Sequence, residues 1–281
     1  MEILRTCAEL REWSRDERND SGNTIGLVPT MGALHAGHAS LIRASCATVG
    51  FTAVSIFVNP TQFGPSEDYA RYPRAFDADC ALAKAEGASV VFAPSVEEMY
   101  PTGSATFIEV EGLSGRLDGQ SRPGHFRGVA TVVAKLMIAS EADRAFFGQK
   151  DAAQVAVLRR LAADLRVATE IVVCPIVRDA DGLALSSRNV YLSPAERAQA
   201  LALGRAIRNA EAQFAAGERR ANVLIDTART ILAAEPDVRI DYVELVDWAT
   251  LLPIASAEAG SLFAVAAWVG ATRLIDNAVF L

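Results

Sequence analysis

The feature that most constrains the fold is a regular alternation of two kinds of segment in the first 177 residues. Short apolar segments, as expected for buried strands, lie at residues 24–29, 51–58, 88–93, 144–147 and 169–177. Segments with helical patterning separate them, at residues 39–49, 75–86, 128–140 and 151–165. This spacing is typical of βαβ units, and right-handed crossovers then predict an α/β fold with a Rossmann-like, doubly wound parallel sheet. Ligands of such sheets bind at the carboxyl ends of the strands. A further short strand is expected at residues 105–110.

The chain changes character after Arg178. Two Ala-rich amphipathic helices are expected at residues 194–216 and 219–234, and alternating apolar and polar residues follow at 239–246 and within 261–269. This order predicts a second, smaller α+β domain. The length of 281 residues also favours two domains, at about 150 residues each. We place the boundary within residues 176–186 and divide the chain into residues 1–177 and 178–281.

Charge and hydropathy exclude several partners. The net charge of −7 and the pI near 5.1 argue against a surface that binds nucleic acid or anionic lipid. The longest apolar run, Val129 to Ser140, is interrupted by Lys135 and falls short of the roughly 18 residues of a membrane span. The first 20 residues carry charges throughout, so we expect neither a membrane partner nor a secretory leader. We expect a cytoplasmic location.

The cysteines and lysines carry different information. The four cysteines lack the CxxC-like spacing of zinc sites, so we expect small buried side chains and no metal bound directly by the protein. Only three of the 27 basic residues are lysines: Lys84, Lys135 and Lys150. A lysine in an Arg-rich chain either marks a site that needs a compact ammonium or remains by chance on a solvated face.

Two histidines lie where the first predicted strand passes into its helix. The segment Met31–His38 reads MGALHAGH, so Gly37 permits close backbone approach and His35 and His38 face the same way in a first helical turn. Free N–H groups and the positive dipole end at this terminus suit a phosphate. A histidine that packs in the core or caps the helix, and a metal pair, are the alternatives.

Three later segments also carry polar groups at predicted strand ends or helix starts. Asn59 and Gln62 can donate and accept hydrogen bonds, which suits a hydroxylated substrate or, alternatively, a capped turn. Residues 122–130, RPGHFRGVA, enter a helix and suit either an anion or loop packing. Residues 148–154, GQKDAAQ, combine a glycine with Lys150, and Asp151 suits a helix cap, a ribose hydroxyl or Mg²⁺.

A fifth segment lies just past the domain boundary. Residues 185–189, LSSRN, offer hydroxyls and a cation on a loop and resemble a degenerate Lys-Met-Ser-Lys-Ser loop. Together with the His-x-Gly-His pattern, this is similar to the nucleotidyl-transferring α/β superfamily, in which that loop closes over the triphosphate.

The five blocks together are more specific than the superfamily. In this order and spacing they closely resemble the pantothenate synthetase (pantoate–β-alanine ligase) family, over about residues 24 to 192: PTMGALHAGH, FVNPTQFGPSEDYARYPR, RPGHFRGVATVVAKL, FFGQKDAAQ and LALSSRNVYL. Two departures are Leu185, where the family commonly has Met, and Gln149, where many members have Glu. Neither side chain is an obvious participant in the chemistry.

The resemblance implies an amide-forming ligase that condenses pantoate with β-alanine, with ATP converted to AMP and diphosphate through a pantoyl adenylate. It implies catalytic roles for His38, His35, Lys150 and Arg188, and pantoate or β-alanine contacts for Gln62, Gln154 and Asn59. Mg²⁺ is expected to enter with ATP, and the assembly is expected to be a homodimer whose C-terminal domain is a lid on the β-alanine side. The implied ATP-binding residues are Met31, Gly32, Ala33, Leu34, His35, Ala36, Gly37, His38, Gly148, Gln149, Lys150, Asp151, Val177, Leu185, Ser186, Ser187 and Arg188.

Two other functions are alternatives. An adenylyltransferase of the same superfamily would transfer AMP to a phosphorylated acceptor and release a dinucleotide, but the QFG and GQKD segments argue against it. A non-catalytic nucleotide-binding module is disfavoured because both histidines, Lys150 and Arg188 are present.

Overall fold

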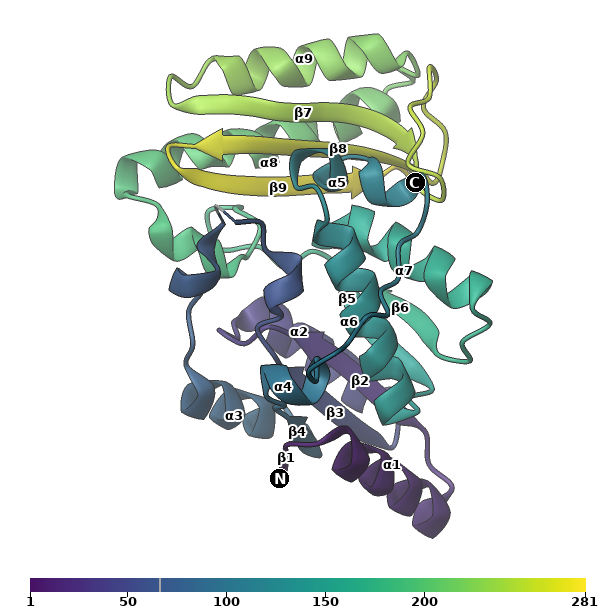
Figure 1. Cartoon of the computed structure of the whole chain (residues 1–281). Helices are drawn as coiled ribbons and strands as arrows, with labels where there is room; N and C mark the ends of the chain where they lie inside the picture. Colours follow the sequence, from purple (N-terminus) through teal and green to yellow (C-terminus); the bar gives the residue numbers. More distant parts are fainter. Residues whose placement is uncertain (66) are drawn as a thin grey trace. The chain divides into compact units, whose positions relative to one another are not determined.

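The computed structural model describes residues 1–65 and 67–281, so Ser66 of the second sequence block lies outside the described residues. The chain forms two compact units, one of residues 1–148 and 157–174, the other of residues 149–156 and 175–281 (Figure 1). The sequence-based division after Val177 therefore differs from these units in two places. Residues 149–156 and 175–177 both belong to the second unit.

The first unit is built on a six-stranded sheet in which every neighbouring pair is parallel. The strand order is β1-β4-β3-β2-β5-β6, so the chain moves from β2 outward in one direction and later from β5 outward in the other. This confirms the doubly wound sheet and makes the β2/β5 pair its switch point. The strands are β1 (Glu2–Leu4), β2 (Ile25–Thr30), β3 (Phe51–Ile56), β4 (Val90–Phe92), β5 (Arg144–Gly148) and β6 (Glu170–Cys174).

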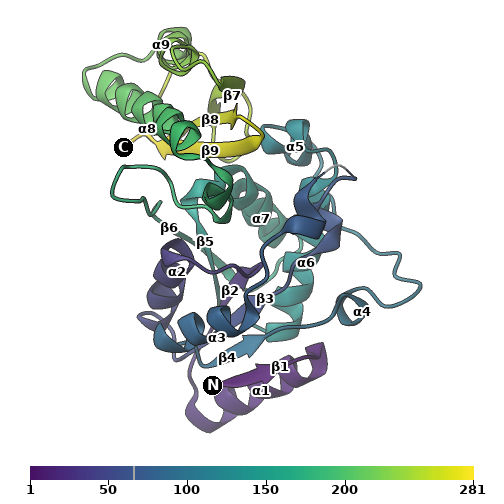
Figure 2. The ribbon, with the colours of Figure 1, turned by 90° about the vertical axis from the view of Figure 1, so that its left-hand side faces the viewer.

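Helices cover both faces of this sheet. Figure 2 shows α2 and α3 on one side of the strands and α6 on the other. Side chains of α2 and α3 pack with alternate strand residues such as Val28, Val54 and Val91 in one buried cluster. The helices of this part are α1 (Cys7–Ser21), α2 (Ala36–Cys46), α3 (Phe76–Ala85), α4 (Val96–Met99), α5 (Asp118–Ser121), α6 (His125–Ser140) and α7 (Ala152–Asp164), the last beginning within the second unit.

The strand expected at residues 105–110 is absent: the structure has no regular secondary structure there. Side chains, rather than a neighbouring strand, bind its backbone. Ile108 N–H donates to Thr131 Oγ1 at 2.9 Å, and Val110 N–H donates to Ser114 Oγ at 3.1 Å. The strand-like residues of this segment therefore predicted a strand wrongly, because a strand also needs a neighbouring strand to pair with.

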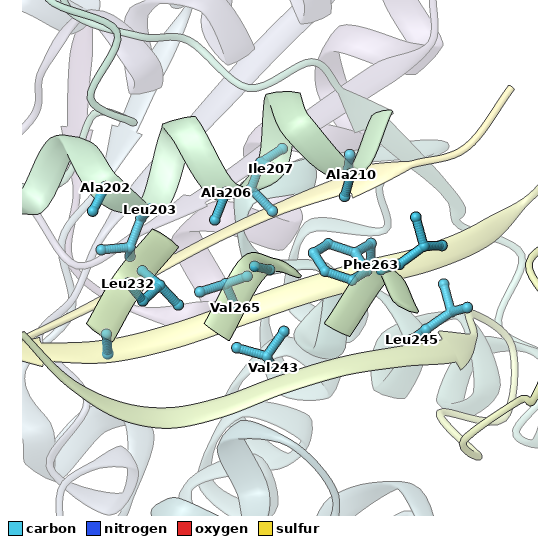
Figure 3. Close-up of a cluster of buried hydrophobic side chains, with 14 of the residues drawn as sticks. Ala202, Leu203, Ala206, Ile207, Ala210, Leu232, Val243, Leu245, Phe263 and Val265 are labelled. Atoms are coloured by element: carbon cyan, nitrogen blue, oxygen red, sulfur yellow. The ribbon is translucent and has the colours of Figure 1, made fainter. Parts of the chain in front are cut away.

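The second unit contains a three-stranded antiparallel sheet of β7 (Val238–Asp247), β8 (Ser261–Val269) and β9 (Thr272–Val279), with β8 in the middle. Its helices are α8 (Pro194–Ala215) and α9 (Ala221–Ala233). Figure 3 shows Leu203 and Ile207 of α8 and Leu232 of α9 packing against Val265 of β8. The smaller α+β domain is thus confirmed, with its core between one sheet face and two helices.

Two sequence expectations about the whole chain have structural counterparts. No helix in residues 1–65 or 67–281 is long and apolar enough to cross a membrane. The cysteines are all unpaired, but the expectation that they are buried was wrong for Cys46, which is exposed, whereas Cys174 is buried.

Candidate active site

The turn after β2 is held by a buried carboxylate. Gly32 and Ala33 both have positive φ, +81° and +50°, which is uncommon for a non-glycine residue. Asp79 of α3 accepts hydrogen bonds from the N–H groups of Ala33 and Leu34 at 2.9 and 2.7 Å. Its side chain is only 3% exposed. The two bonds offset the strain at Ala33 and fix the direction in which α2 begins.

The two predicted histidines begin α2 as a reciprocal cap. His35 is the N-cap residue, and its Nδ1 accepts from Gly37 N–H at 3.1 Å. His38 Nδ1 accepts from His35 N–H at 3.3 Å, and the two ring centroids lie 4.1 Å apart. The sequence treated capping and phosphate contact as alternatives, but the structure shows the capping role directly. The two roles are compatible because they use different ring nitrogens.

The caps determine the tautomer of both rings. A neutral imidazole that accepts at Nδ1 carries its proton on Nε2, so each ring presents an N–H donor. The donors lie at the N-terminus of α2, immediately after β2 at the switch point, where helix dipole and backbone N–H groups favour an anion. Gly148 ends the adjacent strand β5, and Asn59 and Gln62 follow β3 on the other side of β2. Three predicted segments therefore meet at one edge of the sheet.

Asn59 holds Gln62 in the short helix η1 (Pro60–Gln62). Asn59 is fully buried; its Nδ2 donates to Gln62 Oε1 at 3.1 Å and to Gly128 O at 3.2 Å. Its Oδ1 accepts from Thr61 N–H and from Thr61 Oγ1–H at 3.2 and 2.9 Å. Asn59 therefore uses its amide to cap η1 and to orient Gln62, which leaves the Gln62 amide nitrogen as the available donor.

Gly128 allows α6 to approach η1. A Cβ on Gly128 would lie 2.2 Å from Thr61 O and 2.8 Å from Gln62 N. No other residue type would fit without moving η1. The glycine of the RPGHFRGVA segment thus contributes loop packing, one of the two interpretations left open in the sequence.

A charged network supports the same loop from the third segment. Glu67 accepts from Arg122 Nε–H and NH2 at 2.9 and 2.6 Å, and Arg122 NH1 lies 2.9 Å from His125 Nε2. Because guanidinium only donates, His125 Nε2 must accept, and Nδ1–H donates to Gln62 O at 2.9 Å. Burial, with the nearby Arg122 charge, lowers the pKa of His125 to about 4. His125 is therefore neutral at physiological pH.

The second unit carries the other predicted residues. Lys150 and Asp151 lie in the turn η4 (Gln149–Asp151), with Lys150 Nζ 3.2 Å from Asp151 Oδ1. Gln154 is half-buried in the first turn of α7. Ser186 caps the helix η5 (Ser187–Tyr191) by accepting from Arg188 N–H at 3.3 Å.

The loop before η5 is closed by a backbone bond. Leu185 N–H donates to Val177 O at 3.0 Å, so the predicted nucleotide residue Val177 and the segment Leu185–Arg188 are adjacent. The predicted residues are thus divided: Met31–His38, Asn59, Gln62 and Gly148 lie in the first unit, the others in the second.

Sequence reasoning missed Asp79. Asp79 in a first helical turn reads as a dipole-compensating acid, and only the fold shows which backbone it holds. Within the described residues there is no group of three or more His, Cys, Asp or Glu side chains that could hold a metal ion.

Comparisons with known proteins extend this geometry. A family model described as pantoate-beta-alanine ligase matches residues 2–279. A pantothenate synthetase from Acidobacterium capsulatum is 61% identical over 90% of this chain and 85% of its own length. One from Koribacter versatilis is 54% identical over 99% of this chain and 96% of its own.

Solved structures agree. The crystal structure of pantothenate synthetase from Thermus thermophilus has a TM-score of 0.94 and 45% identity, over 99% of both chains. That of a pantoate-beta-alanine ligase from Francisella tularensis, complexed with beta-gamma ATP and beta-alanine, has a TM-score of 0.76 and 31% identity, over 99% of this chain and 97% of its own.

Proposed function

This chain belongs to the pantoate–β-alanine ligase family, and from that premise we propose how its residues carry out the reaction. It is an ATP-dependent ligase that joins pantoate to β-alanine. The observation that carries the proposal is the pair of histidines that cap the start of α2 through their Nδ1 atoms, at the switch point of the sheet.

The proposed reaction has two steps because oxide is a poor leaving group from a carboxylate. First, a pantoate carboxylate oxygen bonds to the α-phosphorus of ATP, and the bond to the bridging oxygen breaks, which releases diphosphate. Second, the β-alanine nitrogen bonds to the acyl carbon, the carbon–oxygen bond to AMP breaks, and the nitrogen loses a proton. The products are pantothenate, AMP and diphosphate.

The first step gathers negative charge on phosphate oxygens, so positioning and electrostatic stabilisation supply the catalysis. His38 and His35 donate to the phosphates from Nε2, and Lys150 and Arg188 neutralise the triphosphate. The nucleotide contacts come from the segments Met31–His38, Gly148–Asp151 and Leu185–Arg188, with Val177.

Mg²⁺ is proposed to arrive with ATP. It prefers oxygen ligands and commonly combines one or two carboxylates with substrate phosphates. Asp151 is the carboxylate within the proposed nucleotide segments. When bound, the ion screens the charge of the triphosphate.

Gln62 and Gln154 are proposed to bind pantoate, with Gln62 also near β-alanine. The bonds of the Gln62 side chain support this role, because Asn59 binds Oε1 and so directs the amide nitrogen to a ligand oxygen. Asn59 then acts on the substrate through Gln62.

We further propose a cytoplasmic homodimer, which light scattering coupled to size-exclusion chromatography and cell fractionation would test.

The test is isotope exchange between diphosphate and ATP. We expect exchange that requires pantoate and does not require β-alanine, because the first step can run alone. Exchange that appears only after β-alanine is added would contradict the two-step course. Product analysis separates the alternative: AMP and an amide identify the ligase, whereas a dinucleotide would identify an adenylyltransferase.

A further inference from the structure

Asn277, near the end of the chain, binds the turn that carries Lys150. It lies in β9 and is 4% exposed. Its Nδ2 donates to Gln149 O at 3.0 Å and to Lys150 O at 2.9 Å, one hydrogen to each carbonyl. Its Oδ1 accepts from Gln149 Nε2 at 3.2 Å. The whole side-chain amide is therefore used on two successive residues of η4.

A second side chain continues the attachment. Trp248 Nε1–H donates to Ala152 O at 2.9 Å. Three backbone carbonyls between residues 149 and 152 are thus bound by side chains from the C-terminal part of the chain. This explains why residues 149–156 belong to the second unit although β5, immediately before them, belongs to the first.

The neighbour of Asn277 holds the other nucleotide segment of this unit. Asp276 is 3% exposed and accepts from Arg178 NH1 and NH2 at 2.7 and 2.9 Å. Arg178 begins the hairpin-like loop that is closed by the Leu185–Val177 bond. Asp276 Oδ1 also accepts from Asn277 N–H at 2.9 Å. Two adjacent residues of β9 therefore connect η4 with the loop leading to Arg188.

We propose that Asn277 is a positioning residue for Lys150: it sets the place of the Lys150 ammonium through the backbone of η4, and Asp276 gives Asn277 a fixed site on β9. Asn277 is not itself proposed to touch ATP. Lys150 Nζ lies 3.2 Å from Asp151 Oδ1 of the same turn, so the place of the ammonium follows the backbone of η4. A displacement of about 1 Å at a reacting centre is enough to cost about 100-fold in rate.

The test is a double-mutant cycle, which rests on the proposed function for its readout. Asn277→Ala and the near-isosteric Asn277→Asp, which lacks the donors, are each made alone and with Lys150→Ala. Pantoate-dependent exchange and ATP binding are measured, with thermal unfolding of every variant. The matched control is Val265→Ala, which removes buried methyl groups opposite Asp276 in the β8–β9 ladder but leaves the η4 bonds intact.

We expect either Asn277 substitution to lower exchange about 10- to 100-fold when Lys150 is present, and less than about 3-fold when it is Ala. Val265→Ala is expected to lower the melting temperature with little change in exchange at 25 °C. Equal losses with and without Lys150, or no loss at all, would overturn the inference. If the wild-type chain shows no exchange, the proposed function fails, and the same cycle read in ATP affinity still decides the role of Asn277.

Discussion

At the scale of single residues, the structure shows one nitrogen of each histidine at the start of α2 in a capping role, and we propose the phosphate contact for the other nitrogen. Nδ1 of His38 accepts from the backbone of His35, and Nε2–H is the proposed donor. Lone substitutions to alanine would remove both functions at once. Replacement amides separate them, because Asn places its oxygen near the position of Nδ1 and Gln places its nitrogen near that of Nε2.

We predict that His38→Ala and His38→Asn both lower the rate of pantoyl adenylate formation by about 10²- to 10³-fold, the usual cost of losing one preorganised donor. His38→Gln is expected to recover part of this loss. ATP binding should weaken much less, since the donor meets charge that grows in the transition state. Single-turnover adenylate formation beside equilibrium ATP binding measures both. A loss confined to ATP affinity would make His38 a ground-state ligand.

The neutral state of His125 predicts a pH dependence of stability. Its pKa falls from 6.5 to about 4 on folding, so the unfolded chain binds more protons between these values. Stability from this group is complete above about pH 6.5 and is lost as the pH falls to about 4, by an amount of about 3 kcal/mol. Denaturant unfolding at several pH values gives the free energy of unfolding as a function of pH. Between about pH 4 and 6.5 this free energy should change less steeply with pH for His125→Asn than for the wild type.

The control for this experiment is Leu165→Ala, at an exposed side chain that does not titrate; it keeps His125 and should keep the wild-type dependence of stability on pH. The facing groups Glu67, Asp118 and Arg122 are present in all three proteins, so their own titration is shared. Parallel curves for the wild type and His125→Asn would show that His125 is not held neutral.

At the scale of elements, close packing of α6 against η1 places Gln62. We predict that Gly128→Ala raises the KM for pantoate at least about 10-fold while ATP affinity is retained, because the new Cβ would lie 2.2 Å from Thr61 O and must displace η1. Overpacking of this kind costs about 1–3 kcal/mol of stability. Steady-state kinetics with each substrate varied, beside denaturant unfolding, are the measurements.

Gly115→Ala is the matched control, since a Cβ there has nothing within 4 Å and the residue has no positive φ. It should leave both KM values and stability close to those of the wild type. If Gly128→Ala affects ATP and pantoate equally, the packing of α6 does not act through Gln62.

The elements also show what the sequence can and cannot predict. Buried parallel strands are mainly apolar on both faces, so β2 and β3 are predictable from short runs rich in apolar and β-branched residues. β1 has three residues, too few for a periodicity, and was missed. The segment 105–110 has strand-like residues but no neighbour to pair with, a property of the fold rather than of the segment.

The candidate site divides in the same way. His35, His38 and Lys150 stand in local motifs, so the sequence alone marks them as candidates. Asp79 and Asn277 act on backbone groups 45 and 127 residues away, respectively. No local pattern marks such a bond, because an aspartate or asparagine elsewhere in a helix or strand looks the same in sequence.

At the scale of the whole molecule, the two units have separate buried cores, and the chain crosses between them three times, after residues 148, 156 and 174. Parts of a protein that share a core tend to open together in hydrogen exchange. Residues 149–156 are a short insertion whose carbonyls are bound from β9 and from Trp248. Their exchange should therefore report the second unit rather than the first, although both flanking segments belong to the first.

We predict that Leu203→Ala, a substitution in the buried core of the second unit, speeds amide exchange in β7 to β9, α8, α9 and residues 149–156 together. The free energy of unfolding of this unit is expected to fall by about 2–5 kcal/mol, because the substitution leaves a cavity at a side chain that is 1% exposed. Ile42→Ala, which removes a fully buried side chain from the first unit, should speed exchange in β2 and β5.

The control Leu165→Ala, at a side chain that is 55% exposed, should change neither set by more than about 0.5 kcal/mol. Peptide-level exchange measured by mass spectrometry decides the matter: if residues 149–156 respond to Ile42→Ala and not to Leu203→Ala, the turn that carries Lys150 is stabilised by the first unit, and the bonds from Asn277 and Trp248 do not control it.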